Sequence, residues 1–120
     1  MIQGEFDEIG QLFFEIELVA GNGEIFSINA LLDTGSTEWL AIDKQDLEAL
    51  EWEQIGTRQV VTARGITTFE NYAAKVIIDG EEFIVPAVAG ADFRETIIGV
   101  PWLRRKRLVV DFPTGELTLG

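Results

Sequence analysis

Hydrophobic residues fall in short runs that alternate with polar residues, and glycine-rich turns separate the runs. Residues 12–19 begin with an apolar cluster and then alternate, which is typical of a half-buried strand. The segment Gly21-Asn22-Gly23 is a strong tight-turn signal, and residues 24–32 resume the extended pattern. The pattern therefore predicts a hairpin whose second strand delivers Asp33 to its end.

The rest of the chain continues in the same way, with short strands and frequent turns. Residues 38–42 predict another strand, and residues 43–50 predict a short helix because an N-cap residue precedes good helix formers. Pro101 suits the first turn of a second helix over residues 100–107, with Trp102 on its buried face. The further predicted strands are residues 57–62, 66–78, 81–88, 96–99, 108–112 and 116–119. The expected fold class is mostly β, with one or two short helices.

Composition and charge narrow the class of protein. The 120 residues, of which 47% are hydrophobic, suit a single globular domain over residues 1–120 with a core of about 12–119. The net charge is −12, and residues 1–57 hold 13 acidic residues and one basic residue, Lys44. This acidity argues against a nucleic-acid partner, and the basic run 104–107 is interpreted as a solvated helix end.

Targeting signals are not apparent. No apolar stretch reaches the roughly 18 residues of a membrane span, and the first eight residues lack the basic start and apolar core of a signal peptide. We therefore expect no membrane partner and a cytoplasmic location.

The chain contains neither cysteine nor histidine. Catalytic triads built on histidine are therefore excluded within the chain, as are thiolate metal sites and disulfides. We expect no metal and no cofactor. Any hydrolytic chemistry must depend on carboxylates, hydroxyls, lysine or backbone groups.

The strongest candidate for chemistry is Asp33, in Asp33-Thr34-Gly35-Ser36, which follows the apolar run 30–32. A carboxylate next to a buried strand must be hydrogen-bonded or protonated. One alternative is an ordinary turn with an Asx-type hydrogen bond and a glycine at positive φ. A catalytic carboxylate would need a second one, because two close carboxylates share a proton and so supply an acid and a base together. No second Asp-Thr/Ser-Gly occurs, so a second Asp33 would have to come from another copy of the chain across a two-fold axis.

Three elements in order resemble the retropepsin-like aspartic proteases, single-domain homodimeric relatives of pepsin. Residues 31–37 are similar to the family's catalytic motif, and Ile97-Ile98-Gly99 is similar to its second signature, a strand that crosses behind the catalytic turn and leads into a helix. The hairpin with Gly65 near its tip stands in the place of the flap. The resemblance implies a closed β-barrel of the acid protease fold with a flap hairpin.

Two details favour the cellular, DNA-damage-inducible-type branch over the retroviral enzymes. The chain closes with two strands rather than one, and Ala63-Arg64-Gly65 in the flap is similar to that branch. Thr37 and Val100 stand where retroviral enzymes usually place an acid and an arginine that pair. The retroviral way of bracing the site is therefore not expected here.

The resemblance also implies roles for individual residues. Asp33 would activate water, Thr34 would bond the partner's turn through its hydroxyl, and Gly35 would offer its carbonyl to the substrate backbone. The expected flap residues over an extended peptide are Arg64, Gly65 and Ile66, and the expected lining residues are Ser36, Ile98, Val100 and Trp39. Plain core packing remains the alternative for Ile98 and Trp39, and turn formation remains the alternative for Ser36 and Thr37.

The predicted function is that of an aspartic endopeptidase, a homodimer that hydrolyses extended peptides or unfolded proteins. The alternative is a catalytically silent dimeric module of the same fold that binds peptides or has a structural role. A third interpretation, a phosphate loop of the actin and sugar-kinase type, needs two large lobes, and 120 residues do not supply them.

Overall fold

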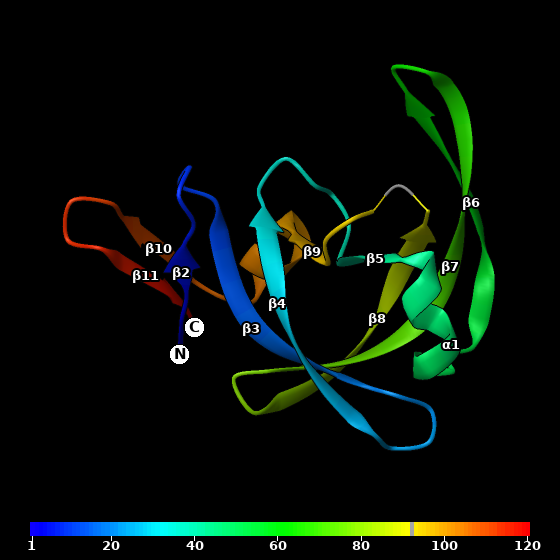
Figure 1. The fold of residues 1–120 in the computed structure, drawn as a ribbon, viewed down its shortest axis with the longest axis horizontal. Helices are drawn as coiled ribbons and strands as arrows, with labels where there is room; N and C mark the ends of the chain where they lie inside the picture. Colours follow the sequence, from blue (N-terminus) through cyan, green and yellow to red (C-terminus); the bar gives the residue numbers. More distant parts are fainter. Residues whose placement is uncertain (92) are drawn as a thin grey trace.

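The computed structural model describes residues 1–91 and 93–120 and is dominated by β-strands (Figure 1). The strands are β1 (Ile2–Gln3), β2 (Glu5–Phe6), β3 (Leu12–Val19), β4 (Ile25–Asp33), β5 (Leu40–Asp43), β6 (Gln54–Thr62), β7 (Gly65–Ile78), β8 (Glu81–Gly90), β9 (Ile97–Gly99), β10 (Leu108–Asp111) and β11 (Glu116–Leu119). The helical segments are the 3₁₀ helix η1 (Lys44–Asp46), the α-helix α1 (Leu47–Leu50) and the 3₁₀ helix η2 (Val100–Arg104). The mostly β class predicted from the sequence is confirmed.

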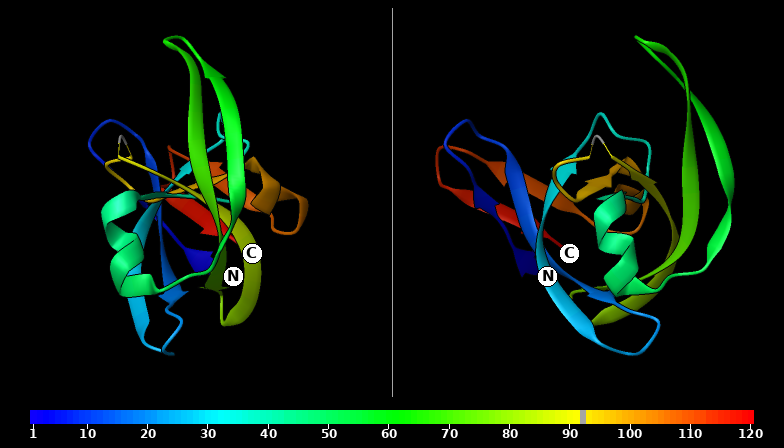
Figure 2. Two further views of the ribbon diagram at one scale, coloured as in Figure 1. Left: turned by 90° about the vertical axis from the view of Figure 1, so that its right-hand side faces the viewer. Right: turned by 45° about the vertical axis from the view of Figure 1, so that its right-hand side comes forward.

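A strongly curled sheet forms the body of the molecule. Its strand order is β2-β3-β4-β9-β5-β8-β7-β6, and β3 pairs additionally with β7 through residues 17–19 and 75–77 (Figures 1 and 2). The closed barrel implied by the resemblance stays a prediction. The feature that matters for the site is β9, which lies between β4 and β5 and pairs parallel with β4, so that Gly99 lies opposite Asp33.

The core lies inside this curl. Side chains alternate along β3, so that Phe14, Ile16 and Leu18 are buried whereas Glu15 is exposed. Trp102 of η2 is the largest fully buried side chain and packs into the same core. The period-two pattern therefore decides which face of β3 is buried.

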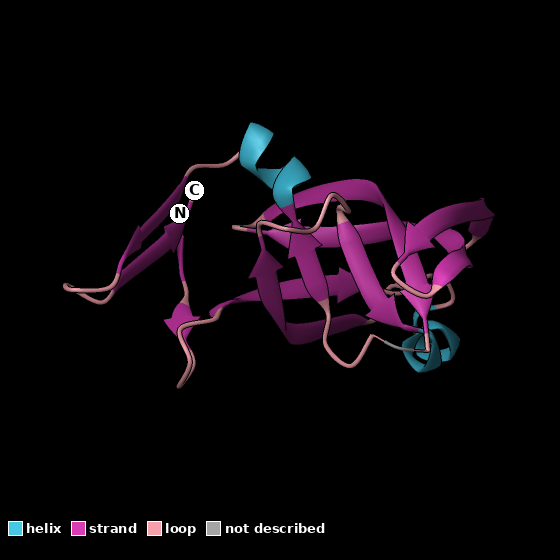
Figure 3. Ribbon diagram, turned by 90° about the horizontal axis from the view of Figure 1, so that it is seen from above, coloured by secondary structure: helices cyan, strands magenta, loops and turns pink. Residues whose placement is uncertain are grey.

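A second, smaller sheet joins the two ends of the chain. Its order is β1-β11-β10, and Figure 3 shows it beside the curled sheet with both termini on it. The sequence pattern predicts β10 and β11 but no strand before residue 12. Ile2 and Phe6 nevertheless pack against the core, and the Gly4 amide donates to the Leu117 carbonyl (2.8 Å).

The second predicted helix is wrong in length and type. The sequence predicts a helix over residues 100–107, whereas η2 is a 3₁₀ helix that ends at Arg104. The Arg105 and Lys106 amides both donate to the Trp102 carbonyl, which closes the last turn. Arg107 is already extended, because its backbone pairs with Gly120. Among the described residues, no helix is long and apolar enough to cross a membrane.

The β6–β7 hairpin projects from the body of the molecule (Figures 1 and 2). Thr62 pairs with Gly65 across a two-residue turn of Ala63 and Arg64, and Gly65 has a φ of +111°. This is the hairpin predicted with Gly65 near its tip, although β6 begins three residues earlier than expected. β6 is the last strand of the sheet, so its other edge is unpaired within the described sheet.

Candidate active site

Asp33 is the last residue of β4, where the buried strand reaches the surface. Leu32 before it is buried, whereas Asp33, Thr34 and Gly35 are exposed. The Gly35 amide donates to Asp33 Oδ1 (2.8 Å), and the Ser36 amide donates to the Asp33 carbonyl (3.0 Å). The carboxylate is therefore held by hydrogen bonding and exposed in the single chain. We call residues 33–38 the Asp33 loop.

Gly35 has a spatial role beside this carboxylate. A Cβ at this position would lie 3.1 Å from Asp33 Oδ1, closer than ordinary van der Waals contact. Gly35 does not have the positive φ expected of an ordinary Asx turn, although the Asx-type hydrogen bond itself is present. The glycine therefore leaves room for its amide to approach the carboxylate.

Gly99 supports the Asp33 loop from behind. A Cβ there would collide with the Glu38 carbonyl and lie 2.5 Å from the Ser36 carbonyl. The Val100 amide donates to the same Ser36 carbonyl (2.9 Å), and the Glu38 amide donates to Ser36 Oγ (3.3 Å). Only glycine allows the two segments to pack this closely, and Ser36 joins them as a turn residue.

The Trp102 indole fixes the far end of the loop. Its Nε1 donates to the Trp39 carbonyl (2.7 Å), and its ring meets that of Trp39 edge-on at 5.0 Å and 85°. Phe83 contacts Trp102 in the same manner at 5.0 Å and 86°. Trp39 thus packs against the core. Ile98 is fully buried on β9, which pairs with β4, so in the single chain it is part of the core.

The expected flap residues lie at the tip of the β6–β7 hairpin. Arg64, Gly65 and Ile66 are exposed, and the tip stands off from the body on the same side as the Asp33 loop (Figures 1 and 2). Val100 is 36% exposed beside the loop. The single chain brings Ser36 and Val100 close to Asp33 but leaves the hairpin tip away from it.

Comparison with solved structures reveals the type of fold. A retropepsin-like aspartic protease from Rickettsia conorii matches with a TM-score of 0.73 and 23% identity, over 99% of this chain and 88% of that chain. This chain has the fold of the retropepsin-like aspartic proteases. The EIAV protease, complexed with the inhibitor HBY-793, matches with a TM-score of 0.66 and 15% identity, over 88% of this chain and 98% of that chain.

The protease of Simian Foamy Virus (mac) matches the same retropepsin-like fold with a TM-score of 0.57 and 21% identity, over 80% of this chain and 99% of that chain. No protein-family model matches the sequence, and no curated protein matches it. The likeness therefore lies in the backbone, and the roles of the residues at the site have to be argued from their own geometry.

A cavity of about 300 Å³ adjoins the Asp33 loop of the retropepsin-like fold. Its lining residues are Gly10, Gln11, Leu12, Leu31, Leu32, Asp33 and Thr34. Ile9, which precedes the lining residue Gly10 in the chain, is 81% exposed, on a turn in which Asp7 Oδ1 accepts from the amides of Ile9 (3.1 Å) and Gln11 (2.7 Å). A fixed turn that presents a large apolar side chain to solvent is a feature that the sequence pattern did not reveal.

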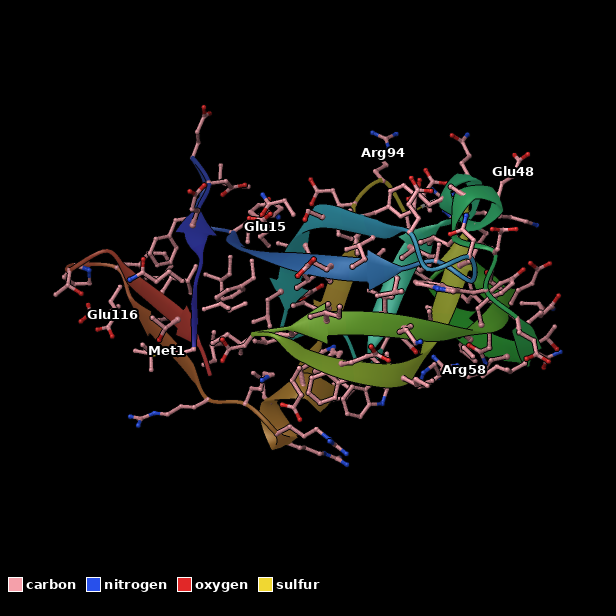
Figure 4. The ribbon with its side chains drawn as sticks, turned by 90° about the horizontal axis from the view of Figure 1, so that it is seen from below. Met1, Glu15, Glu48, Arg58, Arg94 and Glu116 are labelled. Carbon is pink, nitrogen blue, oxygen red and sulfur yellow. The ribbon has the colours of Figure 1, made fainter. Side chains whose placement is uncertain are left out.

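An ion pair between Glu38 and Arg58 is the other feature that sequence reasoning missed. Arg58 lies on β6 (Figure 4), and its guanidinium meets the carboxylate of Glu38, whose side chain is only 18% exposed. The two residues belong to separate elements, so no spacing rule indicates their contact. Thr37 is exposed, and the acidic partner in this structure is one residue further along the chain.

The pKa values of Asp46 and Tyr72 are raised by their surroundings. Burial raises the pKa of Asp46 above its ordinary value of 3.8, and the negative charge of Asp43 raises it further. The hydrogen bond between the Tyr72 hydroxyl and Glu70 (2.7 Å) raises the pKa of Tyr72. Within the described residues, no group of three or more acidic, histidine or cysteine side chains is placed to hold a metal ion.

Proposed function

We propose that this protein is an aspartic endopeptidase that acts as a homodimer. The observation that carries the proposal is the position of Asp33 in a retropepsin-like fold: an exposed carboxylate at the end of β4, fixed by the Gly35 amide and supported from behind by Gly99. Such a carboxylate needs a second one to provide both an acid and a base. The chain has a single motif of this kind, so the second carboxylate is Asp33 of a second copy.

The reaction divides between the two carboxylates. The ionised one takes a proton from water as the oxygen attacks the peptide carbonyl, which forms a tetrahedral intermediate. The protonated one donates its proton to the carbonyl oxygen as this intermediate forms. A proton then passes to the leaving amine as the C–N bond breaks. This shared-proton arrangement is the established one for aspartic proteases.

The surface around Asp33 suits a two-fold partner. Asp33 and Thr34 are exposed and line a cavity whose other lining is partly apolar, and Ile9, next to the lining residue Gly10 in the chain, is 81% exposed. A second copy across this surface would bury these groups and bring its own Asp33 alongside. The Thr34 hydroxyl would then bond the backbone of the partner's loop.

The β6–β7 hairpin would act as the flap. Arg64, Gly65 and Ile66 at its tip would cover an extended peptide and exclude water from the scissile bond. Gly35 would present its carbonyl to the substrate backbone, and Ser36 and Val100 would border the side-chain pockets. The exposed tip, which stands off from the body, supports this role because a cover has to leave room for the substrate to enter.

The finer assignments follow from the same residues. The β10–β11 hairpin supports the cellular, DNA-damage-inducible-type branch, and the pairing of β3 with β7 supports a closed barrel. Both assignments are part of the proposal, as is a cytoplasmic location.

The test is cleavage of an unfolded protein or a peptide library across roughly pH 4 to 7, where a pair of carboxylates that shares a proton is expected to work. The wild type is expected to cleave, and Asp33→Asn is expected to abolish cleavage. A statine-type mimic of the transition state serves as a second control, since it should inhibit the wild type. Cleavage that persists in Asp33→Asn would overturn the mechanism. Tight peptide binding without cleavage under any condition would support the silent binding module instead.

A further inference from the structure

The Glu38–Arg58 ion pair joins the Asp33 loop to the β6–β7 hairpin. Glu38 ends the Asp33 loop, and Arg58 lies on β6, the last strand of the curled sheet. The exposed fractions of the two side chains are 18% and 45%. A carboxylate this far removed from water needs a partner, so the contact is stronger than an ordinary surface pair.

The backbone around Glu38 is held in place by contacts with neighbouring residues. The Glu38 amide donates to Ser36 Oγ (3.3 Å), and its carbonyl lies so close to Gly99 that a Cβ there would collide with it. The next carbonyl, that of Trp39, accepts from the buried Trp102 indole (2.7 Å). The backbone on both sides of Glu38 is therefore held in place within the loop that begins at Asp33.

Arg58 lies where the hairpin leaves the body. Its cross-strand partner is Phe69, which stacks on Phe93 with ring centroids 5.4 Å apart and an interplanar angle of 24°. One residue further on β7, Glu70 lies 3.7 Å from Lys44 of η1. Both strands are thus attached to the body at this level, and residues 59–68 extend beyond it to the tip.

We propose that the Glu38–Arg58 pair positions the flap relative to the catalytic carboxylate. This inference rests on the proposed function, because it assigns the hairpin the role of a cover. The pair restrains the outer strand of the hairpin at its root and biases residues 59–68 toward the orientation that closes over a bound peptide. Glu38 and Arg58 are positioning residues, and they take the place of the brace that Thr37 and Val100 do not provide.

Loss of the pair should weaken substrate binding more than it slows the chemical step. When the closed orientation is populated less often, the apparent affinity falls by the same fraction. We expect Arg58→Gln and Glu38→Gln each to raise KM about fivefold, with kcat changed less than about twofold. Added salt should raise the KM of the wild type toward that of the variants, because salt screens the ion pair of the wild type but does not affect the uncharged amide of the Gln variants.

The matched control is Lys75→Gln. It removes the same type of charge from a pair with Glu82 (3.3 Å) whose side chains are 42% and 53% exposed and which joins β7 to β8. Its KM should equal that of the wild type. Two further variants separate charge from packing: Arg58→Lys should keep a low KM, and the exchanged pair Glu38→Arg with Arg58→Glu should restore much of the loss.

A second readout does not depend on catalysis. The chain lacks cysteine, so Ala63→Cys in the hairpin turn gives one attachment point for a trifluoromethyl tag. Arg58→Gln should shift or broaden the fluorine resonance, and Lys75→Gln should leave it unchanged. A wild type that does not cleave would refute the proposed function, and the fluorine spectrum would still decide whether the pair holds the hairpin. Unchanged KM in both single variants, or an unchanged fluorine spectrum in Arg58→Gln, would overturn the inference.

Discussion

Replacement of the buried tryptophan behind the site provides a quantitative test of how the Asp33 loop is held. Trp102 is fully buried, donates to the Trp39 carbonyl (2.7 Å) and contacts the rings of Trp39 and Phe83. Trp102→Phe keeps an aromatic ring but removes the indole N–H. The variant therefore tests the contribution of the hydrogen bond and of the extra ring volume of the indole, while an aromatic residue stays in the core.

The expected loss of stability has two parts. The Trp39 carbonyl loses its donor in a half-buried setting, which costs about 1–3 kcal/mol. The smaller ring leaves unfilled space, which costs about 1–2 kcal/mol. We expect a loss of about 2–5 kcal/mol in the free energy of unfolding, or a fall in Tm of about 8–20 °C for a domain of this size. Cleavage should slow as well, because Trp102 holds the residue that directly follows the Asp33 loop, and this loop carries the proposed catalytic carboxylate.

The assay is thermal and urea unfolding followed by circular dichroism at a fixed protein concentration, since the midpoint of a dimer depends on concentration. The matched control is Trp52→Phe, because the Trp52 indole also donates to a backbone carbonyl, that of Val19 (2.8 Å). Trp52 is only half-buried, so water can replace its bond and we expect a loss of about 0.5–1.5 kcal/mol. Equal losses in the two variants, or a loss below about 1 kcal/mol in Trp102→Phe, would refute this explanation of how the loop is held.

Three further predictions address other parts of the molecule. Gly99→Ala should abolish cleavage and cost about 1–3 kcal/mol of stability, measured by urea unfolding, because the added Cβ collides with backbone carbonyls of the Asp33 loop. Ile9→Asp should weaken the dimer at least about tenfold in sedimentation, whereas added salt should strengthen the wild-type dimer, since each chain carries a charge of −12. Asp46→Asn should raise Tm at pH 7, because the pKa of Asp46 is raised in the folded state and its ionisation therefore lowers the stability of the wild type. The gain in Tm should shrink as the pH falls toward the ordinary pKa of 3.8, where the folded wild type keeps its proton.

The parts of the fold that the sequence predicts are those with a clear period. β3 alternates between buried and more exposed residues over residues 14–18, so this part of its burial pattern can be recognised before any contact is known. β1 and β2 have two residues each, too few to show a period, and they depend on pairing with β11 and β3. The helix expected over residues 100–107 ends early because the backbone of Arg107 pairs with Gly120, which extends the pairing of β10 with β11 by one residue.

Some residues of the candidate site can be predicted from the sequence and others cannot. Local chemistry points to Asp33 and Gly35, and the structure adds why Gly35 is needed there. The role of Ile98 is ambiguous in the sequence because β9 has only three residues, and the structure places its side chain in the core. The contact between Glu38 and Arg58 joins two distant segments of chain, so it depends on the tertiary fold and has no local signal.

The claim that two copies of Asp33 form one active site is tested most directly by mixing. Wild type and Asp33→Asn are unfolded together, refolded in varying ratios at constant total protein, and assayed for cleavage. If each site needs both carboxylates, activity follows the square of the wild-type fraction, so an equal mixture retains about one quarter of the wild-type activity. If activity instead falls in proportion to the wild-type fraction, so that an equal mixture retains about one half, each chain works alone and the two-copy site is contradicted.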